Sequence, residues 1–118
     1  MAIQTTAEKN SLATKYGVDT PFGALFTADP GGTGAVVGEV TGGAPAYARK
    51  SLVWGAAANG VITATATFDV PAGTTVTFAG VCTTGTAGTA DLKDKVAVTS
   101  QNFASQGTYT LTLTFTES

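Results

Sequence analysis

Few of the residues that commonly carry enzymatic chemistry occur in this sequence. The 118 residues include no histidine and a single cysteine, Cys82. Without histidine the chain cannot form a Ser-His-Asp or Cys-His arrangement, and it lacks the commonest zinc ligand. Cys82 lies on the apolar side of an alternating segment with no basic residue beside it. We interpret Cys82 as a small buried hydrophobic residue and predict no catalytic residues and no enzymatic activity.

The acidic residues and the glycine-rich segment also fail the tests for a ligand site. The acids lack the alternating Asp-x-Asp-x-Asp spacing of a calcium loop, and Asp29 before Pro30 is typical of a turn. Residues 31–43 end in Gly-Gly and are followed by Ala44-Pro45, without the Gly-Lys-Ser/Thr of a phosphate-binding loop. No carboxylate pair stands out for glycoside hydrolysis, although folding could still bring one together. We expect neither a metal nor a cofactor.

Charge and hydropathy bear on the partners of the protein. The net charge is −2, and the six basic residues are too scattered to neutralise a phosphate backbone. No apolar run reaches the ~20 residues that span a bilayer. We therefore expect neither nucleic acid nor membrane as a partner. Charged residues make up only 12% of the chain, so either neighbouring subunits cover much of the surface or threonines keep the free protein in solution.

The chain length allows one domain, and the composition favours an all-β fold. The 23 threonines suit the solvated faces of strands, and the 15 glycines suit turns. One short helix is predicted over residues 6–16, with Thr5 or Thr6 and Glu8 as its capping residues and Gly17 as its end. The remaining residues, about 20–118, are predicted to form a β-sandwich of about six to seven strands.

Two segments alternate most clearly between apolar residues and threonine. One alternates over residues 62–70, and the other is the last segment, in which Tyr109, Leu111, Leu113 and Phe115 share one side. Period two over such lengths predicts half-buried strands whose apolar sides face one core. Four further strands are predicted at residues 22–28, 47–54, 74–83 and 92–98, the last near a sheet edge because it carries three consecutive charges.

Residues 29–43 form a predicted loop that contains six glycines. Ordering such a segment costs much backbone entropy, yet three valines lie within it. We predict that Val36, Val37 and Val40 are buried against a neighbouring subunit, with Glu39 at the polar rim of that contact. The alternative is that the valines fold back over the core of their own domain.

Two aromatic residues are candidates for sugar binding. Trp54, the only tryptophan, is either a core residue under a loop or an exposed platform on which a glycan stacks. Tyr47 is the second candidate for such stacking. Arg49 and Lys50 are interpreted as the solvated start of a strand or as an inter-subunit contact.

Several ordered segments resemble a known group of viral proteins. The segments are TADPG at 27–31, EVTGG at 39–43, PAYARK at 45–50, WGAA at 54–57, FDVPAGTTV at 68–76 and GTYTL at 107–111. In this order they are similar to the short tail-fibre or minor structural proteins of tailed phages that infect actinobacteria. The resemblance covers residues 22–78 well and the C-terminal part loosely, and residues 82–106 do not match.

The resemblance implies a non-enzymatic structural protein of a tailed-phage virion. Such a protein would be an accessory module on the particle exterior, in a tail fibre, in the tail tip or as a capsid decoration. Its partners would be other virion proteins, such as the major capsid or tail proteins, and it would be a homo-oligomer or present in many copies. Neighbouring subunits would then hold both chain termini. The alternative is a module that binds a receptor or glycan on the host surface.

Overall fold

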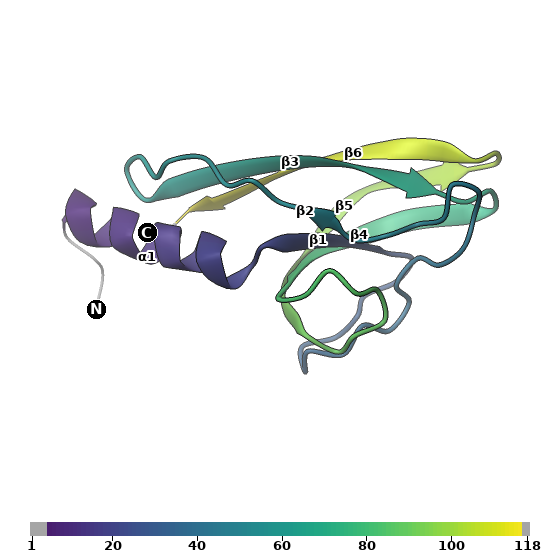
Figure 1. Cartoon of the computed structure of the whole chain (residues 1–118), viewed down its shortest axis with the longest axis horizontal. Helices are drawn as coiled ribbons and strands as arrows, with labels where there is room; N and C mark the ends of the chain where they lie inside the picture. Colours follow the sequence, from purple (N-terminus) through teal and green to yellow (C-terminus); the bar gives the residue numbers. More distant parts are fainter. Residues whose placement is uncertain (1–4, 117–118) are drawn as a thin grey trace.

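The computed structural model describes residues 5–116, which form one helix and six strands (Figure 1). The elements are α1 (Thr6–Asp19), β1 (Phe22–Phe26), β2 (Lys50–Ser51), β3 (Val61–Val70), β4 (Thr74–Cys82), β5 (Leu92–Phe103) and β6 (Gly107–Thr116). The predicted all-β fold with one N-terminal helix is confirmed. The expectation about the termini concerns residues 1–4 and 117–118, which lie outside the described residues.

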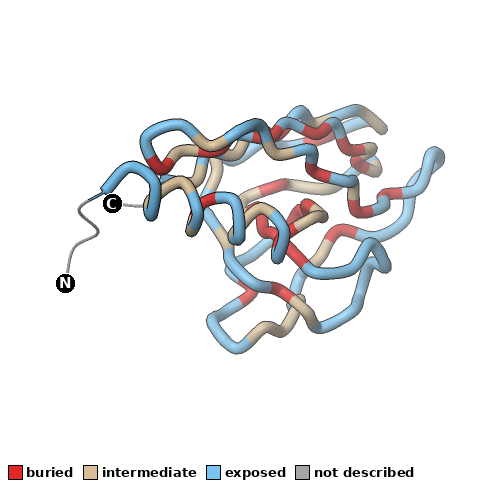
Figure 2. The backbone as a smooth tube through the Cα atoms, turned by 60° about the vertical axis from the view of Figure 1, so that its left-hand side comes forward, coloured by how far each residue is buried: buried red, intermediate tan, exposed pale blue. Residues whose placement is uncertain are grey.

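The strands form two antiparallel sheets. The larger sheet has the order β2-β1-β4-β5, and the smaller consists of β3 and β6 alone. The apolar sides of β3 and β6 face the larger sheet, where Phe68 and Leu111 meet Leu25, Val76 and Val81 in the main core. Figure 2 shows the resulting alternation of buried and exposed residues along the strands.

The predicted inside and outside of β3 and β6 agree with the structure. Leu111 is buried, while Tyr109, Leu113 and Phe115 are half-buried on the same side of β6. The threonines lie on the outer face and form three cross-strand pairs with Oγ1–Oγ1 distances of 3.2–3.4 Å: Thr63–Thr114, Thr65–Thr112 and Thr67–Thr110. These pairs fix the register in which each residue of β3 faces its partner in β6.

Helix α1 continues three residues beyond the predicted end at residue 16. Gly17 does not terminate it, because this glycine serves a packing role inside the last turn. A Cβ atom at Gly17 would lie 3.1 Å from the Trp54 ring, so glycine allows the indole to pack against the helix backbone. The helix ends at Asp19 and is capped by Thr20, whose hydroxyl donates a hydrogen bond to the carbonyl of Tyr16 at 2.7 Å. At 14 residues, and with several charges, α1 is too short and too polar to cross a membrane.

The predicted strand over residues 47–54 is much shorter in the structure, where only Lys50–Ser51 pair with β1. The preceding residues leave the sheet because Tyr47 and Arg49 turn their side chains into the interior. Strand β5 is longer than predicted, and it lies at the edge of the larger sheet as predicted. The turn at 71–73 connects the two sheets, because β3 and β4 each pair with other strands.

Candidate functional site

A buried arginine, Arg49, lies at the centre of the loops below the sheets. Its side chain is fully buried, and the carboxylate of Glu39 beside it is 3% exposed. The Arg49 guanidinium uses all five of its N–H groups. Two donate to Glu39 at 2.9 and 3.1 Å, one to Asp91 at 2.7 Å, and two to the carbonyls of Thr84 and Thr89 at 3.0 and 2.8 Å.

The two carboxylates are also fully engaged. Glu39 accepts further hydrogen bonds from the Tyr47 hydroxyl at 2.9 Å and from the Gly88 amide at 2.8 Å. Asp91 accepts one from the Thr84 amide at 2.6 Å. We call Glu39, Tyr47, Arg49 and Asp91 the Arg49 cluster. It joins loop 27–40, segment 45–50 and loop 83–91. Apart from Lys50 of β2, these three segments lie outside the helix and the named strands.

The polar groups of the Arg49 cluster are satisfied by one another and by backbone atoms, which leaves no unpaired group to bind a ligand. Within residues 5–116 no buried side-chain nitrogen or oxygen lacks a hydrogen-bond partner. Over the same range, no three His, Cys, Asp or Glu side chains gather in a way that would hold a metal ion. Removing one partner of a buried ion pair strongly destabilises a protein, because the remaining charge stays buried without a partner. We therefore regard the Arg49 cluster as a structural element that holds the loops.

The pKa values of the cluster follow from burial and pairing. Burial tends to lower the pKa of Arg49, but hydrogen bonds to Glu39 and Asp91 outweigh this effect and raise it. Burial tends to raise the pKa of Asp91, but hydrogen bonds from Arg49 and Thr84 hold it below its ordinary value. Burial, aided by the charge of Glu39, raises the pKa of Tyr47. Arg49 and Asp91 are thus charged at neutral pH, while Tyr47 is neutral.

The predicted contact residues of loop 29–43 are placed differently from one another. Val40 is 2% exposed and belongs to the main core of its own domain, with its amide bonded to the carbonyl of Leu25 at 3.1 Å. Val36 packs against a smaller cluster that includes Phe26 and Leu92. The predictions that Val40 contacts a neighbour and that Glu39 forms an exposed rim are therefore wrong. Val37, which is 64% exposed, stays a candidate contact.

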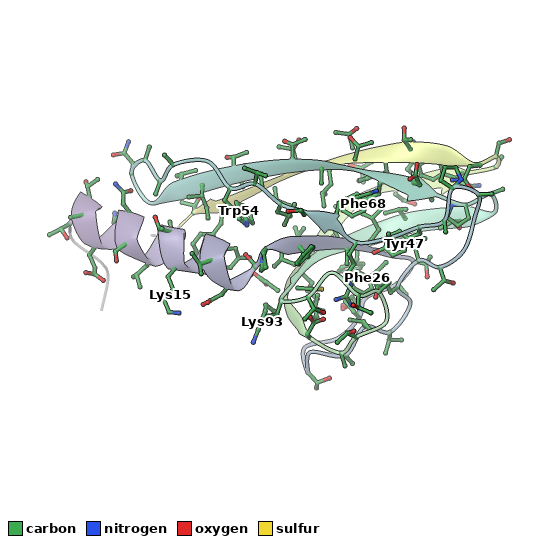
Figure 3. All side chains as sticks on the ribbon, in the orientation of Figure 1. Lys15, Phe26, Tyr47, Trp54, Phe68 and Lys93 are labelled. Atoms are coloured by element: carbon green, nitrogen blue, oxygen red, sulfur yellow. The ribbon has the colours of Figure 1, made fainter. Side chains whose placement is uncertain are left out.

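The two candidate aromatic residues also differ. Tyr47 is buried, accepts a hydrogen bond from the Leu25 amide at 3.0 Å, and stacks near Phe68 between the sheets (Figure 3). Its predicted role in glycan stacking is wrong, because no face of the ring is free. Trp54 is half-buried: its indole N–H donates to the carbonyl of Thr20 at 2.9 Å, and its ring meets Tyr16 edge to face. The interpretation of Arg49 as the solvated start of a strand or as an inter-subunit contact is likewise wrong, because its side chain is buried among residues of its own chain.

A groove of about 380 Å³ opens between β5 and β6, where the two sheets diverge. Val96 and Val98 of β5 line one wall, and Leu113 and Phe115 of β6 line the other. Tyr16 of α1 closes one end, since its ring stacks on Phe115 at a centroid distance of 3.8 Å and its hydroxyl donates to Asp94 at 2.9 Å. Val96 is 46% exposed, so this groove presents apolar side chains to solvent.

The strand edge beside the groove is unprotected. Among residues 5–116, β6 pairs with β3 along one edge only, and residues 107–116 include no charged residue. By contrast, Gly55 and Ala58 cover part of the free edge of β3, and β5 carries charges and register shifts at its edge. Exposed edges without such protection are sites where another strand can add. The sequence carries a signal for this feature in the uncharged alternation of threonine over residues 108–116, which by itself predicts a half-buried strand but not which of its edges is open.

Comparisons with protein-family models, with curated proteins and with solved structures found no match for this chain. The candidate functional site of the described residues is therefore defined by its own geometry: the open edge of β6, the groove beside it, and the exposed Val37.

Proposed function

We propose that this chain is a non-enzymatic structural module of a tailed-bacteriophage virion, an accessory protein on the particle exterior that acts through contacts between subunits. The observation that carries this proposal is the uncharged open edge of β6 beside the apolar groove. Both features are suited to binding another polypeptide strand, whose backbone would pair with β6 and whose apolar side chains would enter the groove.

The placement of the phage-like segments supports a structural role. Glu39 belongs to the EVTGG segment, and Tyr47 and Arg49 belong to PAYARK. These residues use their polar groups on one another and on backbone atoms inside the protein. The segments that carry the resemblance thus hold loops in place, which fits a building block better than a catalyst.

Imaging and composition of purified particles test the proposal. An antibody or a gold-labelled tag on the chain should mark the outside of the head or the tail, and mass spectrometry should find the chain in fixed stoichiometry with the major virion proteins. The proposal would be overturned if the chain is abundant in the lysate but absent from the particles purified from that lysate.

Binding of a host-surface glycan is the second candidate function, and it is favoured by the position of Trp54. The indole lines both the groove and a second hollow of about 320 Å³ beside α1. Because Trp54 is the only tryptophan, its fluorescence reports on that region alone. A saturable change in Trp54 fluorescence on titration with host cell-wall saccharides would favour this function. Fluorescence that does not change during the titration would count against it.

A further inference from the structure

The direction of the backbone groups at the open edge of β6 follows from one hydrogen bond. The amide of Gly55 donates to the carbonyl of Thr63 at 3.0 Å, so this carbonyl points away from β6. Thr63 faces Thr114 in the register of the sheet, and their pair is therefore of the non-hydrogen-bonded kind. The close Oγ1–Oγ1 approach of 3.4 Å between the two residues agrees with this assignment.

Backbone groups alternate in direction along a strand, so the same orientation recurs at every second residue. The N–H and C=O groups that β6 presents at its open edge are accordingly those of its threonines: Thr108, Thr110, Thr112, Thr114 and Thr116. The remaining residues of β6, which carry the apolar side chains, direct their backbone groups toward β3.

The sequence of β6 is nearly symmetric about Thr112. Read in either direction from this residue, it runs Thr, Leu, Thr, aromatic, Thr. An antiparallel pairing of β6 with itself, centred on Thr112, would place Leu111 opposite Leu113 and Tyr109 opposite Phe115. Each threonine would face a threonine, and these are the residues whose backbone groups are available for pairing.

We propose that β6 pairs with β6 of a second copy of this chain, antiparallel about a two-fold axis at Thr112. The two β3-β6 sheets then become one four-stranded sheet with an isologous interface. This inference deepens the proposed function and rests on it for its biological setting, since it names the partner at the open edge.

The side chains fit this arrangement as well as the backbone does. The apolar pairs would occupy the non-hydrogen-bonded positions, where opposing side chains approach most closely. They would lie on the side of the sheet that faces the groove, so the second copy would bring apolar side chains to the groove of the first. Because residues 107–116 carry no charge, self-pairing brings no like charges together.

Disulfide trapping tests the register directly. In a Thr112→Cys variant, the two introduced cysteines would face each other across the axis at a Cα separation of about 5.5 Å, within reach of a disulfide. Thr65→Cys is the matched control, because Thr65 is also exposed and lies directly opposite Thr112 one strand away from the open edge. Cys82 is buried in both variants.

Mild oxidation should convert most of Thr112→Cys into a covalent dimer and leave Thr65→Cys monomeric. Sedimentation should show a concentration-dependent dimer for the native protein, weakened at least about tenfold in Thr112→Lys by repulsion across the axis and unchanged in Thr65→Lys. Circular dichroism verifies that both lysine variants are folded. Equal crosslinking of the two cysteine variants, or a native protein that is monomeric at all concentrations, would overturn the inference.

Failure of this inference is distinguishable from failure of the proposed function. A protein found on particles but monomeric in solution and insensitive to Thr112→Lys in assembly would keep its structural role and lose the two-fold pairing. If Thr112→Lys instead abolishes binding to a different virion protein while the pure chain is monomeric, the edge accepts a foreign strand and the second-copy proposal is overturned. A Thr112-dependent dimer that is absent from particles would refute the virion role alone.

Discussion

At the scale of single residues, Arg49 is a fully buried charge that holds several loop segments together. Its fully buried guanidinium bridges two carboxylates and two carbonyls from separate loops, and the side chains of Glu39 and Asp91 are only 3% and 15% exposed. A lysine could not replace it, because only the planar guanidinium offers five donors in a fixed geometry. Arg49 thus links the loop that carries Glu39 to the loop that carries Thr84, Thr89 and Asp91, alongside the direct hydrogen bond from the Gly88 amide to Glu39.

Replacing Arg49 with leucine should destabilise the protein severely. The substitution leaves Glu39 and Asp91 desolvated and unpaired, and the loss of one partner of a buried pair typically costs about 3–5 kcal/mol. Urea unfolding measures this loss. The control is Lys93→Leu at an exposed position, for which we expect a change within about 0.5 kcal/mol. Equal effects of the two variants would show that the Arg49 cluster contributes little to stability.

The stability of the protein should also fall in acid because of Asp91. Its pKa in the folded protein lies below the ordinary value of about 3.9, so its pairing with Arg49 contributes fully above that pH and is lost as the pH falls through the folded pKa. The free energy of unfolding of the native protein should decrease below about pH 4. The free energy of unfolding of the Asp91→Asn variant should fall less steeply with decreasing pH over the same range. Identical acid slopes for the native protein and Asp91→Asn would contradict this assignment.

At the scale of elements, β6 combines two tasks on its two sides. One edge of β6 pairs with β3 at ten positions, and the inward side chain of Leu111 packs in the main core. The other edge of β6 and the groove side of Leu113 are open, while the Tyr16 ring stacks on Phe115 at the end of the groove. The half-burial of these two residues follows from the narrowness of the smaller sheet, in which residues 5–116 supply no third strand to cover the groove.

Alanine substitutions along β6 should reveal this division. Leu111→Ala should cost about 2–5 kcal/mol, because the residue is 3% exposed and its removal leaves a cavity. Leu113→Ala should cost less in the monomer, since one side of Leu113 already faces the groove. Thr112→Ala, on the outer face, should cost less than either. Thermal or urea unfolding at low protein concentration measures all three, and equal costs for Leu111 and Thr112 would contradict the assignment of the two faces.

At the scale of the whole molecule, the protein is elongated, with extents of 47 × 25 × 23 Å. In Figure 1, α1 projects at one end and the loops of the Arg49 cluster lie below the sheets, apart from β6 at the top. Loop 29–43, which contains the exposed Val37, and strand β6 are thus on different parts of the molecule. A module with two separate contact regions can link more than one neighbour in an assembly.

Two valine substitutions separate contact from stability in loop 29–43. Val37→Ser should change the free energy of unfolding by less than about 0.5 kcal/mol, because the residue is mostly exposed. It should nevertheless reduce incorporation into particles if this loop meets a neighbour. Val40→Ser is the contrasting variant and should destabilise the isolated protein by several times that amount, because it places a hydroxyl in the core. Normal incorporation of Val37→Ser would remove the loop from the contact surface.

The sequence by itself determined the features that depend on local periodicity. Alternation over 62–70 and 108–116 specifies strands and their two faces, and the capping residues of α1 specify where the helix begins. The turn at Asn59–Gly60 was equally predictable, since both residues have positive φ in the structure and this dipeptide favours that conformation. Each of these features is decided by residues within a few positions of one another.

Only the tertiary structure decided which distant segments meet. β3 pairs with β6 across the 36 residues 71–106, although β4 follows β3 directly. The apolar sides of β3 and β6 must both face the larger sheet, and this requirement acts between segments far apart in the sequence. Arg49 lies ten positions from Glu39 and forty-two from Asp91, and no local pattern predicts that three charges will pair in the interior. A side chain that is polar in the sequence can be buried once folding brings enough partners to satisfy it, and those partners are set by the whole chain.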